Sequence, residues 1–221
     1  MDSPTSSASV ASVTPKLSIY QVEKTTEEIR QTCLTNVIKM LTNRKLLNVE
    51  NQEQQIKKII KDRPTDNIYA ITLDTHREES DDTYYVYLTN QKITAVSKQS
   101  SINDFLSSYK ESQNLLVVKD INTKATQYIK NNYPISEIFL EHELMINIVD
   151  YIYVPTYEVL DRNSDQYIHF RNVYQCKKRN LPKMLLSDPI SKYYNLKRDD
   201  IVRIIRPSDT TGQSPFYRLV I

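Results

Sequence analysis

Glycine is almost missing from this sequence, which has a single one, Gly212, in 221 residues. Phosphate-binding loops and the sharp turns that carry serine nucleophiles need several glycines, because the backbone must turn tightly and approach the ligand closely. Both classes of site are therefore excluded. Turns elsewhere must be made by Asn and Asp, which tolerate left-handed backbone geometry better than other residues with a side chain.

Cysteine and histidine are also scarce. Cys33 and Cys176 lie far apart and form no CxxC pair, so they predict neither a disulfide framework nor a zinc site and favour a reducing compartment. His76, His142 and His169 are isolated, and none belongs to an HExxH motif. We therefore expect no bound metal and no cofactor.

No apolar run reaches the length of a membrane span. The most apolar stretch, Met145 to Val154, is interrupted by Asn147 and Asp150, and the N-terminus lacks the pattern of a signal peptide. Residues 1–16 are instead rich in Ser, Thr and Ala, and we expect them to form a disordered tail. These features predict no membrane partner.

Charge is nearly balanced overall but uneven along the chain. The net charge is +2, which argues against binding nucleic acid by bulk electrostatics. Between Phe170 and Arg206, however, the sequence contains ten Lys or Arg residues and three acidic residues, which gives this window a net charge of +7. This window is either a solvated basic face or a surface for an acidic partner.

Helical spacing alternates with short apolar strands up to residue 133. Helices are expected at 25–47, 50–61, 100–112 and 123–132, and strands at 68–73, 83–88, 92–96 and 115–118. The first helix has a capping-box pattern from Thr25 to Glu28, Thr123 is placed to cap the last, and Asn90-Gln91 is read as a turn. The alternation predicts a small α/β domain over 17–133.

A second α/β domain with a mixed sheet is expected over 134–221, after the Pro134 break. Strands are expected at 138–140, 144–148, 201–206 and 216–221, and a helix at 163–174. Asp188-Pro189 is a helix start, and Asn195 can end that helix in left-handed geometry. The strand from Ile201 to Arg206 carries an arginine on each face, and turn residues follow from Pro207 to Gly212.

Catalytic patterns are weak. Asp74 and the acidic cluster of Glu78, Glu79, Asp81 and Asp82 are the only neighbouring carboxylates that a nuclease could use, and no acid-x-lysine strand follows them. The loop from Lys119 to Lys124 joins a strand to a helix start, where free amides and a lysine suit a phosphate. An ordinary loop that joins a strand to a helix and binds nothing would have the same pattern of residues.

The C-terminal residues closely resemble the assembly domain of the fifth subunit shared by the eukaryotic RNA polymerases, which has a short archaeal counterpart. The resemblance covers about 138 to 221. It is carried by Leu181-Pro182-Lys183, Asp188-Pro189-Ile190, Tyr193, Leu196-Lys197-Arg198, Asp200 to Ser208, Thr210 and Gly212, with Glu143-Leu144, Asn147-Ile148 and Val154-Pro155 at its start. The order of elements over 25–133 is similar to the N-terminal jaw domain of the eukaryotic form.

The resemblance implies an architectural subunit without catalytic activity of its own and without a small-molecule substrate. Its C-terminal domain would dock on the largest polymerase subunit, beside other subunits, and its jaw would lie near downstream double-stranded DNA and meet mainly the backbone. The implied interface residues are Asp188, Pro189, Arg198, Arg203, Arg206, Pro207, Ser208, Thr210 and Gly212. Thr123 matches the family's DNA-facing loop, where Lys124 replaces a proline.

Several positions depart from the family pattern. Asn195 and Asp199 replace two glycines, and Tyr151 and Tyr157 replace two histidines. With a composition rich in Ile, Lys, Asn and Tyr, these changes indicate a divergent protist or large-DNA-virus form. Transcription would take place in the nucleus for a cellular protein, and in the virion and at the site of viral transcription for a viral one, the reading we favour. A free-standing nucleic-acid-binding module and a nuclease-like enzyme remain the alternatives.

Overall fold

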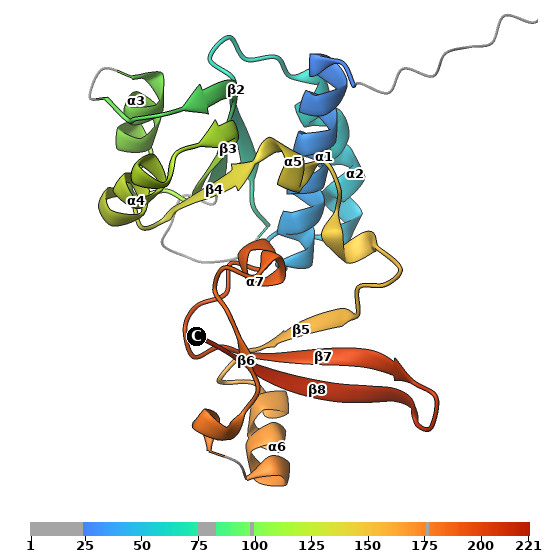
Figure 1. Cartoon of the computed structure of the whole chain (residues 1–221). Coiled ribbons are helices and arrows are strands. Elements are labelled where there is room, and N and C mark those ends of the chain that lie inside the picture. The colour runs from blue at the N-terminus through green and yellow to red at the C-terminus, as the bar shows by residue number, and fades with distance from the viewer. Residues whose placement is uncertain (1–23, 75–82, 98–99, 176) are drawn as a thin grey trace, which may run out of the picture.

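The computed structural model describes residues 24–74, 83–97, 100–175 and 177–221. The tail expected at 1–16, His76, the acidic cluster from Glu78 to Asp82 and Cys176 lie outside the described residues. Within the described part the chain is a mixed α/β protein with two four-stranded sheets, which confirms the predicted fold class (Figure 1).

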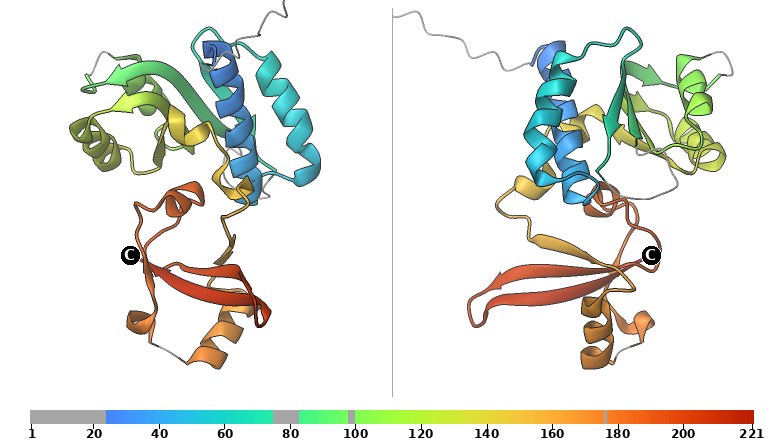
Figure 2. Two further views of the ribbon diagram at one scale, coloured as in Figure 1. Left: turned by 45° about the vertical axis from the view of Figure 1, so that its right-hand side comes forward. Right: turned by 180° about the vertical axis from the view of Figure 1, so that it is seen from behind.

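The first sheet lies between two layers of helices. Its strands run in the order β1-β2-β3-β4, with β1 antiparallel to β2 and the other neighbours parallel. Helices α1 and α2 cover one face, and α3 and α4 cover the other (Figures 1 and 2). The elements are α1 (Thr26–Asn43), α2 (Val49–Lys61), β1 (Ile68–Thr72), β2 (Thr83–Ile93), α3 (Ser101–Ser108), β3 (Asn114–Ile121), α4 (Thr123–Asn132) and β4 (Ser136–Leu140).

Local sequence signals account for most of these elements. Thr25 and Glu28 form the predicted capping box at the start of α1. The central strand β3 is buried on both faces, as its continuous apolar run predicted. Leu115 and Val117 pack toward α1 and α2, whereas Leu116 and Val118 pack toward α3 and α4.

The second sheet has the order β5-β7-β8-β6 and mixed strand directions. One face packs on α6 through Phe170, and the other packs on the segment after α7 through Leu196. The elements of this half are α5 (Glu141–Leu144), η1 (Ile148–Asp150), β5 (Thr156–Leu160), α6 (Asp165–Tyr174), η2 (Lys178–Asn180), β6 (Lys183–Met184), α7 (Pro189–Tyr193), β7 (Ile201–Ser208) and β8 (Gly212–Val220).

Two expected strands are wrong. The residues predicted as a strand at 144–148 end helix α5 and lead into η1. The separate strand at 92–96 does not exist, because β2 continues through Asn90-Gln91 to Ile93 with a register shift between Thr89 and Lys92. Asn90 and Gln91, which we predicted as a turn, therefore lie in a β-bulge within one continuous strand.

Two further details concern the region around the Pro134 break. Thr123 is the first residue of α4, and Asn122 occupies the cap position instead. The strand expected at 138–140 is present as β4, but it pairs with β3 and completes the first sheet. No helix in the described ranges is long and apolar enough to cross a membrane.

Candidate docking interface

The β7–β8 hairpin extends from the second sheet and carries most of the predicted interface residues (Figure 1). The two strands pair from Ile201 opposite Leu219 to Ser208 opposite Gly212, so β7 runs through Pro207 and the turn begins only at Asp209. Gly212 has φ +72, and no atom lies within 4 Å of the position a Cβ would take. Glycine is therefore needed here for backbone conformation and not for space.

Arg203 and Arg206 point to opposite faces of β7, as predicted. Arg203 lies on the face covered by α6, and its Nη1 donates to Glu158 Oε2 at 3.1 Å across the β5–β7 pair. Arg206 lies on the other face, with its guanidinium 5.1 Å from the ring centroid of Phe216, a half-exposed residue of β8. Arg203 is thus held by a partner in its own chain, whereas Arg206 presents its charge at the surface.

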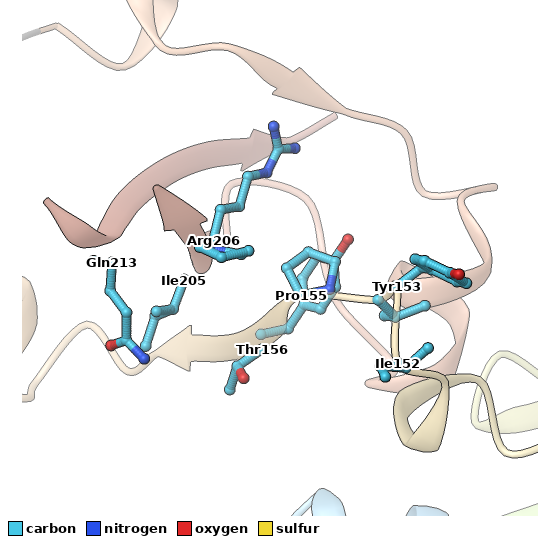
Figure 3. Close-up of a pocket in the computed structure, with 11 residues that line it drawn as sticks. Ile152, Tyr153, Pro155, Thr156, Ile205, Arg206 and Gln213 are labelled. Atoms are coloured by element: carbon cyan, nitrogen blue, oxygen red, sulfur yellow. The ribbon is translucent and has the colours of Figure 1, made fainter. Parts of the chain in front are cut away.

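A cavity of about 660 Å³ lies beside Arg206 (Figure 3). One wall is the segment from Ile152 to Tyr157, and the other is formed by β7 and the start of β8, including Pro207 and Gly212. Ile152 and Tyr153 are 88% and 85% exposed, values that are unusual for large apolar side chains. Tyr157 is partly buried in the same wall, and burial raises the pKa of its phenol.

The remaining interface candidates divide between two other places. Ser208 and Thr210 lie at the tip of the hairpin, where their hydroxyl oxygens are 3.2 Å apart. Asp188 caps α7 by accepting from the Ile190 amide at 2.9 Å, with Pro189 in the first turn as predicted. Arg198 is exposed in the turn after α7, which faces β4 and α4 rather than the hairpin cavity.

That turn uses the two residues that replace family glycines. Asn195 has φ 49 and Asp199 has φ 69, so both adopt the left-handed geometry that the sequence predicted for them. The Asn195 side chain also donates to Glu137 Oε1 at 3.1 Å. Asn195 therefore does more than replace a glycine, because it ties the turn to the first sheet.

The two residues predicted to lie near DNA are exposed at the start of α4. Asn122 makes no side-chain capping hydrogen bond, so the described residues provide no side-chain cap for the first-turn amides of Thr123 and Lys124. Asp120, just before the helix, is paired with Lys92 at 2.6 Å. A lysine thus offsets this carboxylate, and the first turn of α4 carries no acidic residue, which leaves this helix end favourable for an anion.

The nuclease alternative depends on Asp74, which has a structural role. Its carboxylate accepts from the Asn48 amide at 2.9 Å and from Asn51 Nδ2 at 3.1 Å, and so supports the start of α2. Among the described residues, no group of three or more His, Cys, Asp or Glu side chains could hold a metal ion.

Sequence reasoning missed two parts of the site. The first is the exposed apolar wall at Ile152 and Tyr153, for which the run from Tyr151 to Val154 before Pro155 was an available signal. The second is the contact between the two halves, where Arg44 at the end of α1 binds both Glu137 and the C-terminal end of α7. No local pattern marks that contact.

Comparison with known proteins finds a family model and relatives that match the chain. Residues 146–220 match the family model described as RNA polymerase Rpb5, C-terminal domain. A relative from Acanthamoeba polyphaga mimivirus, named DNA-directed RNA polymerase subunit 5, is 33% identical over 213 residues, covering 94% of this chain and 99% of the relative. A relative from Caenorhabditis elegans, named DNA-directed RNA polymerases I, II, and III subunit RPABC1, is 29% identical over 196 residues, covering 84% of this chain and 92% of the relative.

A two-sheet α/β chain with an extended β7–β8 hairpin is thus matched over nearly its whole length by a relative named as a subunit of a DNA-directed RNA polymerase. The chain belongs to the Rpb5 family and is a component of a DNA-directed RNA polymerase.

Proposed function

We propose that the chain is an architectural subunit without catalytic activity, whose C-terminal half docks on the largest polymerase subunit. The observation that carries this proposal is the cavity beside Arg206, where three of the predicted interface residues meet a largely exposed apolar wall. Large apolar side chains beside an arginine are the composition of protein–protein hot spots.

The physics of docking favours Arg206 as the central residue of this surface. Its guanidinium is positioned by the Phe216 ring, so little side-chain freedom is lost when a carboxylate or carbonyl of a partner binds it. Ile152 and Tyr153 would lose exposed apolar area in the same contact. Asp188, Pro189, Arg203, Arg198 and the hairpin tip complete the proposed interface.

The first sheet and its helices would form the jaw. Thr123 and Lys124 lie at an uncapped helix start, which can accept a backbone phosphate of downstream duplex without reading its sequence. Contact of this kind suits an enzyme that moves along DNA. We place the protein in viral transcription, with packaging in the virion, or in the nucleus if its host is a cell.

The experiment that tests the proposal is affinity purification of the tagged full-length chain from its native source, with mass spectrometry of what is recovered. We expect the largest polymerase subunit at equal stoichiometry. Arg206→Glu should lower its recovery at least tenfold while the circular-dichroism melting curve of the isolated chain is unchanged. Lys57→Glu, an exposed cation on α2, is the matched control and should have no effect.

Recovery of the chain without any large subunit would overturn the proposal. Salt-sensitive DNA binding by the isolated chain would then favour a free-standing nucleic-acid-binding module, and Mg²⁺-dependent cleavage lost in Asp74→Ala would favour the nuclease alternative. Full recovery with Arg206→Glu would show that the hairpin cavity is not the docking surface.

A further inference from the structure

A second cleft, of about 740 Å³, separates the two halves of the chain. One side is formed by β4 and by Lys130 of α4, and the other by Leu186, α7 and the turn that ends at Arg198. Its volume lies within the range of about 300–1,000 Å³ that is usual for ligand sites in proteins. It is distinct from the hairpin cavity, with which it shares no lining residue.

The cleft is positively charged after its internal ion pairs are counted. Its two carboxylates are already engaged, Glu137 by Arg44 and Glu143 by Lys192. Lys130, Lys197 and Arg198 also line the cleft, and within the described ranges none of these three cations has a carboxylate partner. An occupant that carries carboxylates would therefore complement the rim.

The rest of the lining combines apolar side chains with small polar ones such as Thr126 and Ser187. Phe139 and Leu196 line the cleft as buried side chains, and Leu186 is 38% exposed. Ser191, only 1% exposed, and Ser136 also line the cleft, and among the described residues neither hydroxyl has a hydrogen-bond partner. Both oxygens are buried, and leaving them unpaired is costly, so a ligand would reach them only after a local rearrangement of this wall.

We infer that the cleft binds an extended segment of a partner polymerase chain that carries acidic residues on one side and aliphatic residues on the other. The inference rests on the proposed function, because it takes the partner from the assembled enzyme. Nucleic acid fits less well, because the one aromatic side chain that the described residues contribute to the lining, Phe139, is buried and has Lys192 Nζ 4.5 Å from its ring centroid, so it offers no free face for base stacking. Binding there would add a further contact between the jaw and the docking half.

The test places a photo-cross-linker in the cleft, as Leu186→p-benzoylphenylalanine, in the tagged full-length chain recovered with its polymerase. We expect a cross-link to one polymerase segment that is rich in Asp or Glu and aliphatic residues. Lys130→Glu should reduce the cross-link at least fivefold per recovered polymerase, and Lys130→Arg should retain it. The same cross-linker at Ile168, which is 51% exposed on α6, is the control for random capture.

Recovered polymerase without a cross-link above the Ile168 level would overturn the inference, as would a cross-link to DNA or RNA, or one insensitive to Lys130→Glu. In each of those cases the polymerase is present, so the proposed function stands. Failure to recover any polymerase subunit with the wild-type chain would instead overturn the proposed function and the cleft inference with it.

Discussion

Arg44 and Glu137 form a bidentate ion pair, with Nη1 and Nη2 of Arg44 at 2.8 and 2.7 Å from the two carboxylate oxygens of Glu137. The pair lies where the two halves meet, and its side chains are only 5% and 14% exposed. Arg44 also donates from Nε to the Tyr193 carbonyl at 2.7 Å, at the C-terminal end of α7. Glu137 accepts from the Tyr84 hydroxyl at 3.0 Å. One pair thus joins α1, the first sheet and α7.

Removing Arg44 should destabilise the protein strongly. Burial by itself would lower the pKa of Arg44, but the hydrogen bonds and charge of Glu137 outweigh it and the pKa is raised, so Arg44 keeps its charge. Arg44→Ala would leave Glu137 buried without its cation and uncap α7. We expect a loss of about 3–5 kcal/mol in the free energy of unfolding, measured by urea denaturation.

The control for that variant is another ion pair on the same helix. Lys39 of α1 pairs with Asp150 at 3.0 Å, but the side chains are 35% and 57% exposed. Lys39→Ala should therefore cost no more than about 1 kcal/mol. If both variants lost the same free energy of unfolding, burial of the Arg44–Glu137 pair would not be what determines its contribution to stability.

Tyr193 should make the folded state sensitive to alkaline pH. Burial raises the pKa of its phenol to about 12, and its hydroxyl donates to Asn147 Oδ1 and accepts from Asn43 Nδ2, both at 2.8 Å. Because the folded pKa lies above the unfolded value of about 10, this stabilisation is complete below pH 10 and is lost as the pH rises toward 12.

Urea unfolding of the wild type and Tyr193→Phe, compared at pH 8 and pH 11, checks this. At pH 8 the variant should be less stable by about 1–3 kcal/mol, because Asn147 and Asn43 lose a buried partner. That difference should shrink at pH 11. A constant difference would mean that the pKa of Tyr193 is the same in the folded and unfolded states.

The elements that follow from neighbouring residues could be predicted from sequence, and the contacts between distant ones could not. Thr25 and Glu28 are three residues apart and mark a helix start by themselves, and Asp188-Pro189 does the same for α7. Asn195 could be placed in left-handed geometry because few residues tolerate it. The residues that make up each signal are neighbours in the sequence, so the signals can be recognised without the structure.

The joint between the halves has no such signal. Arg44 and Glu137 are 93 residues apart in the sequence. No sequence pattern near either residue indicates which residue it pairs with. The predicted interface set likewise mixed Arg203, which is paired with Glu158 of the same chain, with Arg206, which lies at the Phe216 ring. Sequence indicated that these arginines lie on opposite faces of a strand, but only the folded structure shows which of them already has a carboxylate partner.

Reversing the charge of Arg203 should affect stability as well as docking. Arg203→Glu would place two carboxylates directly opposite each other in the β5–β7 pair. We expect a loss of about 1 kcal/mol in the free energy of unfolding. The swapped variant, Arg203→Glu with Glu158→Arg, should restore it to within about 0.5 kcal/mol, since the ion pair is rebuilt in reverse.

Co-purification of the swapped variant separates the two roles. Recovery of the largest subunit at the wild-type level would assign Arg203 to the internal pair alone. Low recovery despite restored stability would show that Arg203 itself meets the partner, as the family resemblance implies.

Lys124 should contribute one phosphate contact to the assembled polymerase. It is exposed at the uncapped start of α4, on the face of the first sheet opposite α2. If Lys124 neutralises one phosphate of downstream duplex, Lys124→Glu should lower affinity on all sequences alike and reduce the slope of log affinity against log salt by about 0.9. Lys57→Glu on α2 makes the same charge change and should leave the slope unchanged.

The measurement is duplex binding by purified polymerase between about 50 and 200 mM salt, a range over which counterion release is resolved. An unchanged slope for Lys124→Glu would mean that the start of α4 does not touch the DNA backbone, and would leave the jaw to position DNA through other surfaces.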